Sequence, residues 1–90
     1  MKIHELNIKF VYWEELIREV KTFELRKNDR GFEVDDLIHF NILGRTILGA
    51  PNSVPDSNMF KITYILDNVP EYGLMDGYCI LGIKRVNLNV

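Results

Sequence analysis

The chain has 90 residues, of which 47% are hydrophobic and 27% charged, and its formal net charge is −2. This length favours a single domain, and the composition is typical of a globular protein. The negative net charge excludes wholesale non-specific binding to nucleic acid, which needs a basic surface. No apolar run approaches the ~20 residues of a membrane-spanning helix. The first residues lack the apolar stretch of a signal peptide, so we expect a cytoplasmic protein with no membrane partner.

Cysteine usage excludes two further classes of protein. Cys79 is the only cysteine, so it has no partner for an internal disulfide and no second cysteine at a metal-binding spacing. Because no basic neighbour is visible in the sequence, we interpret Cys79 as a small core side chain and not as a nucleophile. Neither a metal nor an organic cofactor is expected.

The chain begins with a strand pattern followed by a helix pattern. Residues 2–8 alternate, which predicts a strand with His4 on a buried face as a hydrogen-bonded core histidine. Apolar residues then recur at the spacing of one helical stripe, which predicts a helix from about Phe10 to Val20. The members of that stripe are Trp13, Leu16, Ile17 and Val20.

A charged strand is expected next, over residues 22–27. Phe23 and Leu25 alternate with Thr22, Glu24 and Arg26. The pattern predicts that the two apolar side chains are buried and that the three polar ones share the opposite face. A carboxylate and a guanidinium would then lie side by side on a rigid element, where precise polar sites are usually built.

The remaining elements are mostly strands. Residues 28–31 have the composition of a turn in which Gly31 is free to take a positive φ, and residues 32–34 are expected to be extended. Further strands are predicted over residues 37–43, 60–66 and 77–85. A long loop at 44–58, with a short paired piece near 46–48, an acidic loop at 67–76 and a frayed tail at 86–90 complete the pattern.

Within these strands, alternation predicts which residues are buried. Ile38, Phe40 and Ile42 form the buried face of strand 37–43, which leaves His39 at the surface. In strand 60–66 we expect one continuous face, made of Phe60, Ile62, Tyr64 and Leu66.

The order of elements predicts the fold class. One helix cannot cover both faces of a sheet of five to six strands, so we expect the sheet to curl. The prediction is an α+β, mainly β protein: a small, partly closed β-barrel with one main helix at an end.

Charge is distributed unevenly along the chain. Residues 18–30 contain five basic and three acidic side chains, a local balance of +2, which leaves −4 for the rest. One basic patch on an acidic body suits a confined site for an anion or a short nucleic-acid segment, although solvated charges at strand ends would give the same count.

The string from Lys21 to Arg30, followed by residues 32–38, resembles the signature of the ASCH (activating-signal-cointegrator homology) domains of the PUA-like superfamily. The nearest resemblance is to a small phage and bacterial family of unknown function, with a His-x-Leu start (here residues 4–6), an Ile-Thr-Tyr-Ile-Leu strand (62–66) and a Gly-Tyr strand (77–84). A Val-Gly-Asp turn of that family is replaced here by Val-Asp-Asp, so Asp35 is expected to take a left-handed conformation.

The resemblance implies a PUA-like barrel that binds RNA or a nucleotide. Glu24 and Arg26 would form the floor of a pocket between the helix and strand 22–27, edged by loop 44–58. Arg26 would hold a phosphate or a base edge, and Glu24 would accept a hydrogen bond from an exocyclic amine. The expected ligand-binding residues are Lys21, Thr22, Glu24, Arg26, Lys27 and Arg30, the last two at the rim.

Two other functions stay open. Some small members of the superfamily resemble amidohydrolases of acylated cytidine, with a Lys-Thr-x-Thr-x-Arg motif and a distant Glu. Lys21, Thr22 and Arg26 match that motif, but Glu24 replaces its second Thr. If the chain is an enzyme, Lys21 and Glu24 are the catalytic candidates, although Glu24 would favour the charged form of Lys21, which is not a base. The third possibility is a protein-binding module, against which the strands show no surplus of outward Leu or Phe.

Aromatic side chains add candidates for base stacking. Trp13 is expected in the core, whereas Tyr64, Tyr72 and Tyr78 are better placed to stack on a base. The pattern does not define the oligomeric state, and a monomer is compatible with it.

Overall fold

The computed structural model describes residues 1–44 and 52–87. In chain order the elements are β1 (Ile3–Lys9), α1 (Phe10–Ile17), β2 (Phe23–Lys27), β3 (Leu37–Leu43), β4 (Ser53–Pro55), β5 (Met59–Leu66), the 3₁₀ turn η1 (Pro70–Tyr72) and β6 (Tyr78–Val86). These elements confirm the predicted order of the helix and the main strands, but β4 lies within the segment 44–58 that was predicted to be a loop. The expected paired piece at 46–48 and residues 88–90 of the tail lie outside the described residues.

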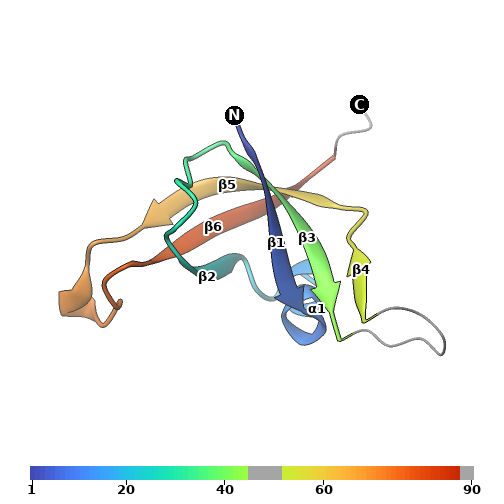
Figure 1. Ribbon diagram of the computed structural model, residues 1–90, viewed down its shortest axis with the longest axis horizontal. Helices are drawn as coiled ribbons and strands as arrows, with labels where there is room; N and C mark the ends of the chain where they lie inside the picture. Colours follow the sequence, from blue (N-terminus) through green and yellow to red (C-terminus); the bar gives the residue numbers. More distant parts are fainter. Residues whose placement is uncertain (45–51, 88–90) are drawn as a thin grey trace.

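The strands of the described residues form a sheet in the order β1-β3-β5-β6-β2, and β4 pairs with β3 beside this path. β1 and β3 are parallel, and all other pairs are antiparallel. The sheet curls so that β5 and β6 cross over β1 and β3, while α1 lies at the ends of β1 and β3 (Figure 1). The architecture is therefore a partly closed, mainly β barrel with a helix at one end, as predicted.

The core fills the concave side of the curled sheet. Ile38, Phe40 and Ile42 of β3 are buried, as the alternation predicted. They pack against apolar residues of the other strands and against Leu16 of α1; the strand residues are Leu6, Ile8, Phe60, Ile62, Cys79, Leu81 and Ile83. Within the described residues, no helix has the length and apolar character needed to cross a membrane.

The helix ends earlier than predicted, at Ile17, and Val20 is exposed instead of lying in the core stripe. The reason is a Schellman motif. The backbone N–H of Glu19 donates to the Leu16 carbonyl at 3.1 Å, and the N–H of Val20 donates to the Glu15 carbonyl at 3.0 Å. Glu19 has φ 60°, the left-handed conformation that glycine normally supplies at this position.

The prediction for the two faces of β2 was wrong. Glu24 is only 4% exposed, whereas Phe23 and Leu25 are 46% and 57% exposed. The pairing with β6 explains the inversion, because Glu24 lies opposite Leu81 and Arg26 lies opposite Cys79. Both β6 residues point into the core, so the polar face of β2 faces the concave side of the sheet and its apolar face points outward.

A register irregularity in β5 changes which of its side chains are buried. The pairing with β6 shifts between Ile62 and Tyr64. Phe60 and Ile62 are buried as predicted, but Tyr64 is exposed and Ile65 packs on the core instead. The continuous face expected from Phe60 to Leu66 is therefore interrupted, as a β-bulge requires.

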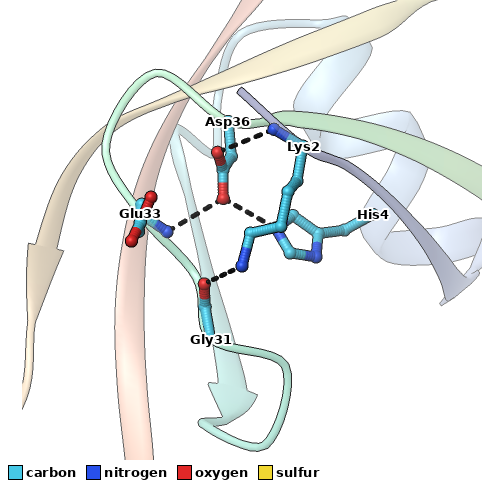
Figure 2. Close-up of polar contacts among 5 residues, drawn as sticks. All are labelled: Lys2, His4, Gly31, Glu33 and Asp36. Atoms are coloured by element: carbon cyan, nitrogen blue, oxygen red, sulfur yellow. Dashed lines mark hydrogen bonds and ion pairs between the residues drawn. The ribbon is translucent and has the colours of Figure 1, made fainter.

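Asp36 ties the start of β1 to the connection between β2 and β3 (Figure 2). Its carboxylate accepts hydrogen bonds from the backbone N–H groups of Lys2 and Glu33, both at 3.0 Å, and lies 2.8 Å from Nε2 of His4. The Lys2 ammonium donates to the Gly31 carbonyl at 2.8 Å. His4 is thus a buried, hydrogen-bonded histidine, as predicted.

Burial by itself raises the pKa of Asp36, but the hydrogen bonds from His4 and the two backbone N–H groups outweigh it and lower the pKa from 3.8 to about 2. The contacts of Asp36 with Lys2, His4 and Glu33 are therefore made by an ionised carboxylate. Next to it in the chain, Asp35 has φ 76°, which confirms the expected left-handed conformation.

Candidate functional site

A cleft of about 470 Å³ opens where the two edge strands of the curled sheet, β1 and β2, approach each other. The end of β1 and the first turn of α1 form one wall, and β2 together with Lys21 forms the other. The lining residues are Asn7, Ile8, Lys9, Tyr12, Lys21, Phe23, Glu24, Leu25 and Arg26. We call this space the seam cleft, because it lies along the seam between β1 and β2.

The floor of the seam cleft is a carboxylate held between two cations. Glu24 Oε1 accepts a hydrogen bond from the Lys21 ammonium at 2.5 Å, and Glu24 Oε2 accepts one from Nε of Arg26 at 3.0 Å. Removing a carboxylate from water is costly unless charges of opposite sign and hydrogen bonds compensate. The two cations supply that compensation and leave the trio with a net charge of +1.

Arg26 also closes the seam. Its Nη2 donates to the backbone carbonyl of Asn7 at 2.6 Å, which joins β2 to β1 through a side chain. Nearer the start of β1, the Lys2 bond to Gly31 joins the same two segments. Because residue numbers rise on one side as they fall on the other, the two edges run antiparallel across the seam. The described residues form no strand ladder between them.

Two aromatic rings flank Lys21 at the mouth of the seam cleft. The ammonium lies 4.9 Å from the ring centre of Tyr12 and 5.6 Å from that of Phe23, within the range of cation–π contacts. Both rings are about half exposed, so they present flat apolar surfaces beside a charged floor.

The structure brings together three of the six predicted ligand-binding residues: Lys21, Glu24 and Arg26 line the seam cleft. Thr22 lines a neighbouring hollow, to which Lys21 also contributes. Lys27 and Arg30 are exposed and line neither space, and Arg30 lies 3.9 Å from the carboxylate of Asp29.

Sequence reasoning missed Asn7, Lys9 and Tyr12, and it assigned Phe23 to the core. The first three lie on β1 and at the start of α1, and only the curl of the sheet brings them opposite β2. No local signal in the sequence indicates that contact. The predicted edge of the pocket also differs, because residues 52–58 do not line the cleft, whereas 45–51 lie outside the described residues.

The remaining titratable candidates lie elsewhere. Cys79 is fully buried, and burial raises the pKa of its thiol, so it is a core side chain as predicted. His39 is partly buried, not a free surface residue: Nδ1 lies 2.8 Å from the Glu5 carboxylate and Nε2 lies 2.8 Å from the Asp56 carbonyl. Within residues 1–44 and 52–87, no cluster of three His, Cys, Asp or Glu side chains is placed to hold a metal ion.

The outer face of β2 corrects a further expectation. Phe23 and Leu25 point outward, so the strands do expose large apolar side chains. Leu25 also contributes to a shallow hollow with Leu74, Met75 and Tyr78 near the β5–β6 turn. Tyr64 and Tyr72 are exposed as well, while Trp13 packs on the core and donates to the Asp56 carboxylate at 2.9 Å.

Together these features define a small, partly closed β-barrel with a charged cleft at its seam. The chain belongs to the family described as Domain of unknown function (DUF3850), whose model matches residues 3–83. The match covers every element described above except the last residues of β6. A search of curated proteins found no significant match.

Proposed function

We propose that the seam cleft binds the base of a nucleotide or of a short single-stranded RNA segment. The observation that carries the proposal is the buried carboxylate of Glu24, held between Lys21 and Arg26 beneath two half-exposed aromatic rings. The resemblance of the 21–30 string to the ASCH domains of the PUA-like superfamily points to the same class of ligand.

The chemistry of the cleft suits a nucleobase. A base offers a flat π-face and an edge of donors and acceptors, which match an aromatic wall and a polar floor. Each oxygen of Glu24 accepts from one cation and keeps capacity for a further donor, such as an exocyclic amine. The volume of about 470 Å³ lies within the ~300–1,000 Å³ of small-molecule sites.

The shape of the cleft favours an unpaired base. The Glu24 carboxylate at its floor is only 4% exposed, and a base that is paired in a duplex already uses the edge that would have to reach this carboxylate. Sequence-specific recognition of RNA generally uses unstacked bases of this kind. The net charge of −2 also argues against broad attraction to a duplex.

Hydrolysis of an acylated nucleoside is the second candidate. The observation in its favour is the direct contact of Lys21 with Glu24 at 2.5 Å inside one cleft, which places an ammonium and a carboxylate where an amide could bind. In that reading a water molecule attacks the acyl carbon, the C–N bond breaks, and the products are the carboxylate and the free exocyclic amine. Lys21 and Glu24 would be the catalytic residues that transfer the protons from the water to the leaving amine.

The test is a binding and turnover screen. The probes are the four nucleosides, their 5′-monophosphates and N4-acetylcytidine, with thermal shift and calorimetry as binding readouts and chromatography for turnover. We expect at least one probe to stabilise the protein, since a ligand at 100 times its Kd adds about 2.7 kcal/mol. Glu24→Gln and Tyr12→Ala should both lose that stabilisation.

Glu33→Gln is the matched control, because it removes the same charge from an exposed side chain that does not line the cleft. Normal binding by both Glu24→Gln and Tyr12→Ala would refute the cleft as the site. Release of acetate from N4-acetylcytidine, lost in Lys21→Ala, would establish the hydrolase instead.

A further inference from the structure

A second hollow, of about 290 Å³, lies between the end of α1, the connection from α1 to β2, and the strands β5 and β6. Its base is apolar, formed by Leu16, Phe60 and Ile83, and its rim is polar. The rim residues are Glu19, Lys21, Thr22, Lys84 and Arg85. Because Lys21 also lines the seam cleft, the two spaces are neighbours that share one residue.

The rim carries an excess of positive charge. The rim holds three cations, Lys21, Lys84 and Arg85, and one carboxylate, that of Glu19. Because Lys21 is already paired with Glu24, the other three charges leave a balance of +1. Within residues 1–44 and 52–87, no carboxylate forms an ion pair with Lys84. Lys61 lies directly opposite Lys84 in the sheet, and like charges in that position repel, although the Asp35 carboxylate, 3.8 Å from Lys61, offsets part of this repulsion. The rim of the hollow therefore carries a positive charge that a bound anion would neutralise.

The one carboxylate at the rim is held in an unfavourable backbone conformation. Glu19 occupies the left-handed position of the Schellman motif, at φ 60°, where a residue other than glycine is strained. Its side chain is exposed and reaches Arg85 at only 4.0 Å. A long, exposed ion pair of this kind contributes little to stability, so another anion can readily replace the Glu19 carboxylate.

Backbone N–H groups bind the last carbonyls of α1, which weakens the negative charge that this end of the helix presents to the hollow. The Glu15 carbonyl accepts from the N–H groups of Val20 and Lys21, at 3.0 and 3.1 Å, and the Leu16 carbonyl accepts from Glu19. The Thr22 side chain adds a hydroxyl donor at the rim.

We infer that this hollow is a phosphate subsite, in which Lys84, Arg85 and Thr22 bind the phosphate of a ligand whose base lies in the seam cleft. Without a ligand, the Glu19 carboxylate pairs with the guanidinium of Arg85, and the phosphate takes the place of that carboxylate. Lys21 stands between the two spaces and contacts the ligand where base and phosphate are joined. The inference rests on the proposed function for the base, but the phosphate subsite can be tested alone.

The phosphate can come from a mononucleotide or from an RNA backbone. Both present tetrahedral oxygens to Lys and Arg, and they differ in charge, because a terminal monoester approaches −2 at neutral pH whereas a diester carries −1. The experiment therefore compares 5′- and 3′-monophosphates with dinucleotides that contain a single phosphodiester.

The first measurement is an amide NMR titration with inorganic phosphate, against sodium chloride at equal ionic strength. We expect phosphate, and not chloride, to shift the signals of residues 19–22 and 83–85. Arg85→Ala should weaken this phosphate response about tenfold. Arg18→Ala is the matched control, because it removes the same charge from an exposed arginine that lines neither space.

The second measurement is calorimetry with the nucleoside probes and their monophosphates. A monophosphate should bind about tenfold more tightly than its nucleoside, and Arg85→Ala should abolish that gain while it leaves nucleoside binding unchanged. Glu19→Gln should strengthen phosphate binding severalfold, because it removes the competing carboxylate.

The outcomes separate the two proposals. Nucleoside binding without any phosphate response would overturn the subsite and leave the base cleft intact. A phosphate response without nucleoside binding would support the subsite and refute the base cleft. Equal affinity for nucleosides and monophosphates, or an unchanged response in Arg85→Ala, would overturn the subsite. The ester that binds more tightly, monoester or diester, identifies the source.

Discussion

Arg26 and Asn7 join the two edges of the sheet: Nη2 of Arg26 donates to the backbone carbonyl of Asn7 at 2.6 Å, where a closed barrel would have a strand ladder. The same guanidinium holds Glu24 through Nε and lies 5.9 Å from the ring centre of Phe40. One side chain therefore organises both the seam and the floor of the cleft. This dual role means that a binding defect in an Arg26 variant has to be separated from a loss of fold.

Arg26→Ala should lower the free energy of unfolding by about 1.5–3 kcal/mol, because it removes charge-assisted hydrogen bonds and leaves Glu24 with a single cation. Arg26→Lys should recover less than half of that loss, since an ammonium lacks the planar fork that spans both partners. Urea unfolding monitored by circular dichroism measures the difference. Arg30→Ala, which breaks an exposed 3.9 Å pair, should change stability by less than about 1 kcal/mol.

Glu19→Gly should raise the free energy of unfolding by about 1 kcal/mol, because glycine takes the left-handed conformation at the end of α1 without strain. Thermal unfolding at a single pH provides the measurement. Val20→Gly, one position further along and also exposed, is the control and should not stabilise the protein. A drop in stability for Glu19→Gly would show that its contact with Arg85 outweighs the backbone strain.

Phe23→Ala should cost less than about 1 kcal/mol, because its ring is 46% exposed on the outer face of β2. Leu81→Ala should cost about 2–5 kcal/mol, because this side chain is fully buried opposite Glu24. Chemical unfolding of the two variants side by side tests the orientation of β2. The reverse ranking would place Phe23 in the core and contradict the pairing described above.

Protonation of Asp36 should contribute to the unfolding of the protein in acid. Its folded pKa is lowered to about 2 from 3.8, so its contribution to stability is complete above pH 3.8 and is lost as pH falls toward 2. Asp36→Asn should be less stable than wild type at pH 7 by about 2–3 kcal/mol, since it removes the charge that accepts these bonds. The difference between the two proteins should shrink below pH 3.8, as measured by urea unfolding at several pH values.

His39 should make the opposite contribution at higher pH. The hydrogen bond to Glu5 raises its pKa above 6.5, as does the bond to the Asp56 carbonyl, while burial opposes the shift. Both ring nitrogens face oxygen acceptors, so only the protonated ring satisfies both. The associated stability is complete below pH 6.5 and is lost as pH rises through the raised pKa. NMR titration of the ring should show a pKa that falls toward 6.5 in Glu5→Gln.

Sequence patterns predicted most of the strands because alternation reports burial on one face. In β1 and β3 one face is clearly apolar, so the buried residues were correctly chosen, and in β6 the assignment of Cys79 to the core was correct. In β2 either face could plausibly be the buried one. Which face is buried depends on the pairing with β6, which lies more than fifty residues away in the chain. The end of α1 has no local signature, since Glu19 and not a glycine takes the left-handed position after it, and the bulge in β5 is marked only by Gly82 on the partner strand.

The candidate site could be predicted only in part, for a related reason. Lys21, Glu24 and Arg26 are close in sequence, so a local motif identified them together. Asn7 and Tyr12 meet them only because the sheet curls, and the curl is set by the whole sheet and not by any one segment. Thr22 was expected in the same pocket but faces the neighbouring hollow, since its position lies just before β2 begins.

β2 is attached to the rest of the sheet on one side only, through five residues of β6. On its other side, within the described residues, the Arg26 side chain and not a ladder of backbone bonds holds it to β1, through the Asn7 carbonyl. A strand fastened in this way can detach without disturbing the pairing among β1, β3, β5 and β6, so its local opening free energy lies below that of global unfolding. Hydrogen exchange should therefore be faster in the edge strand β2 than in the inner strands β3, β5 and β6, and a ligand bound in the seam cleft, which is lined by both β1 and β2, should slow it.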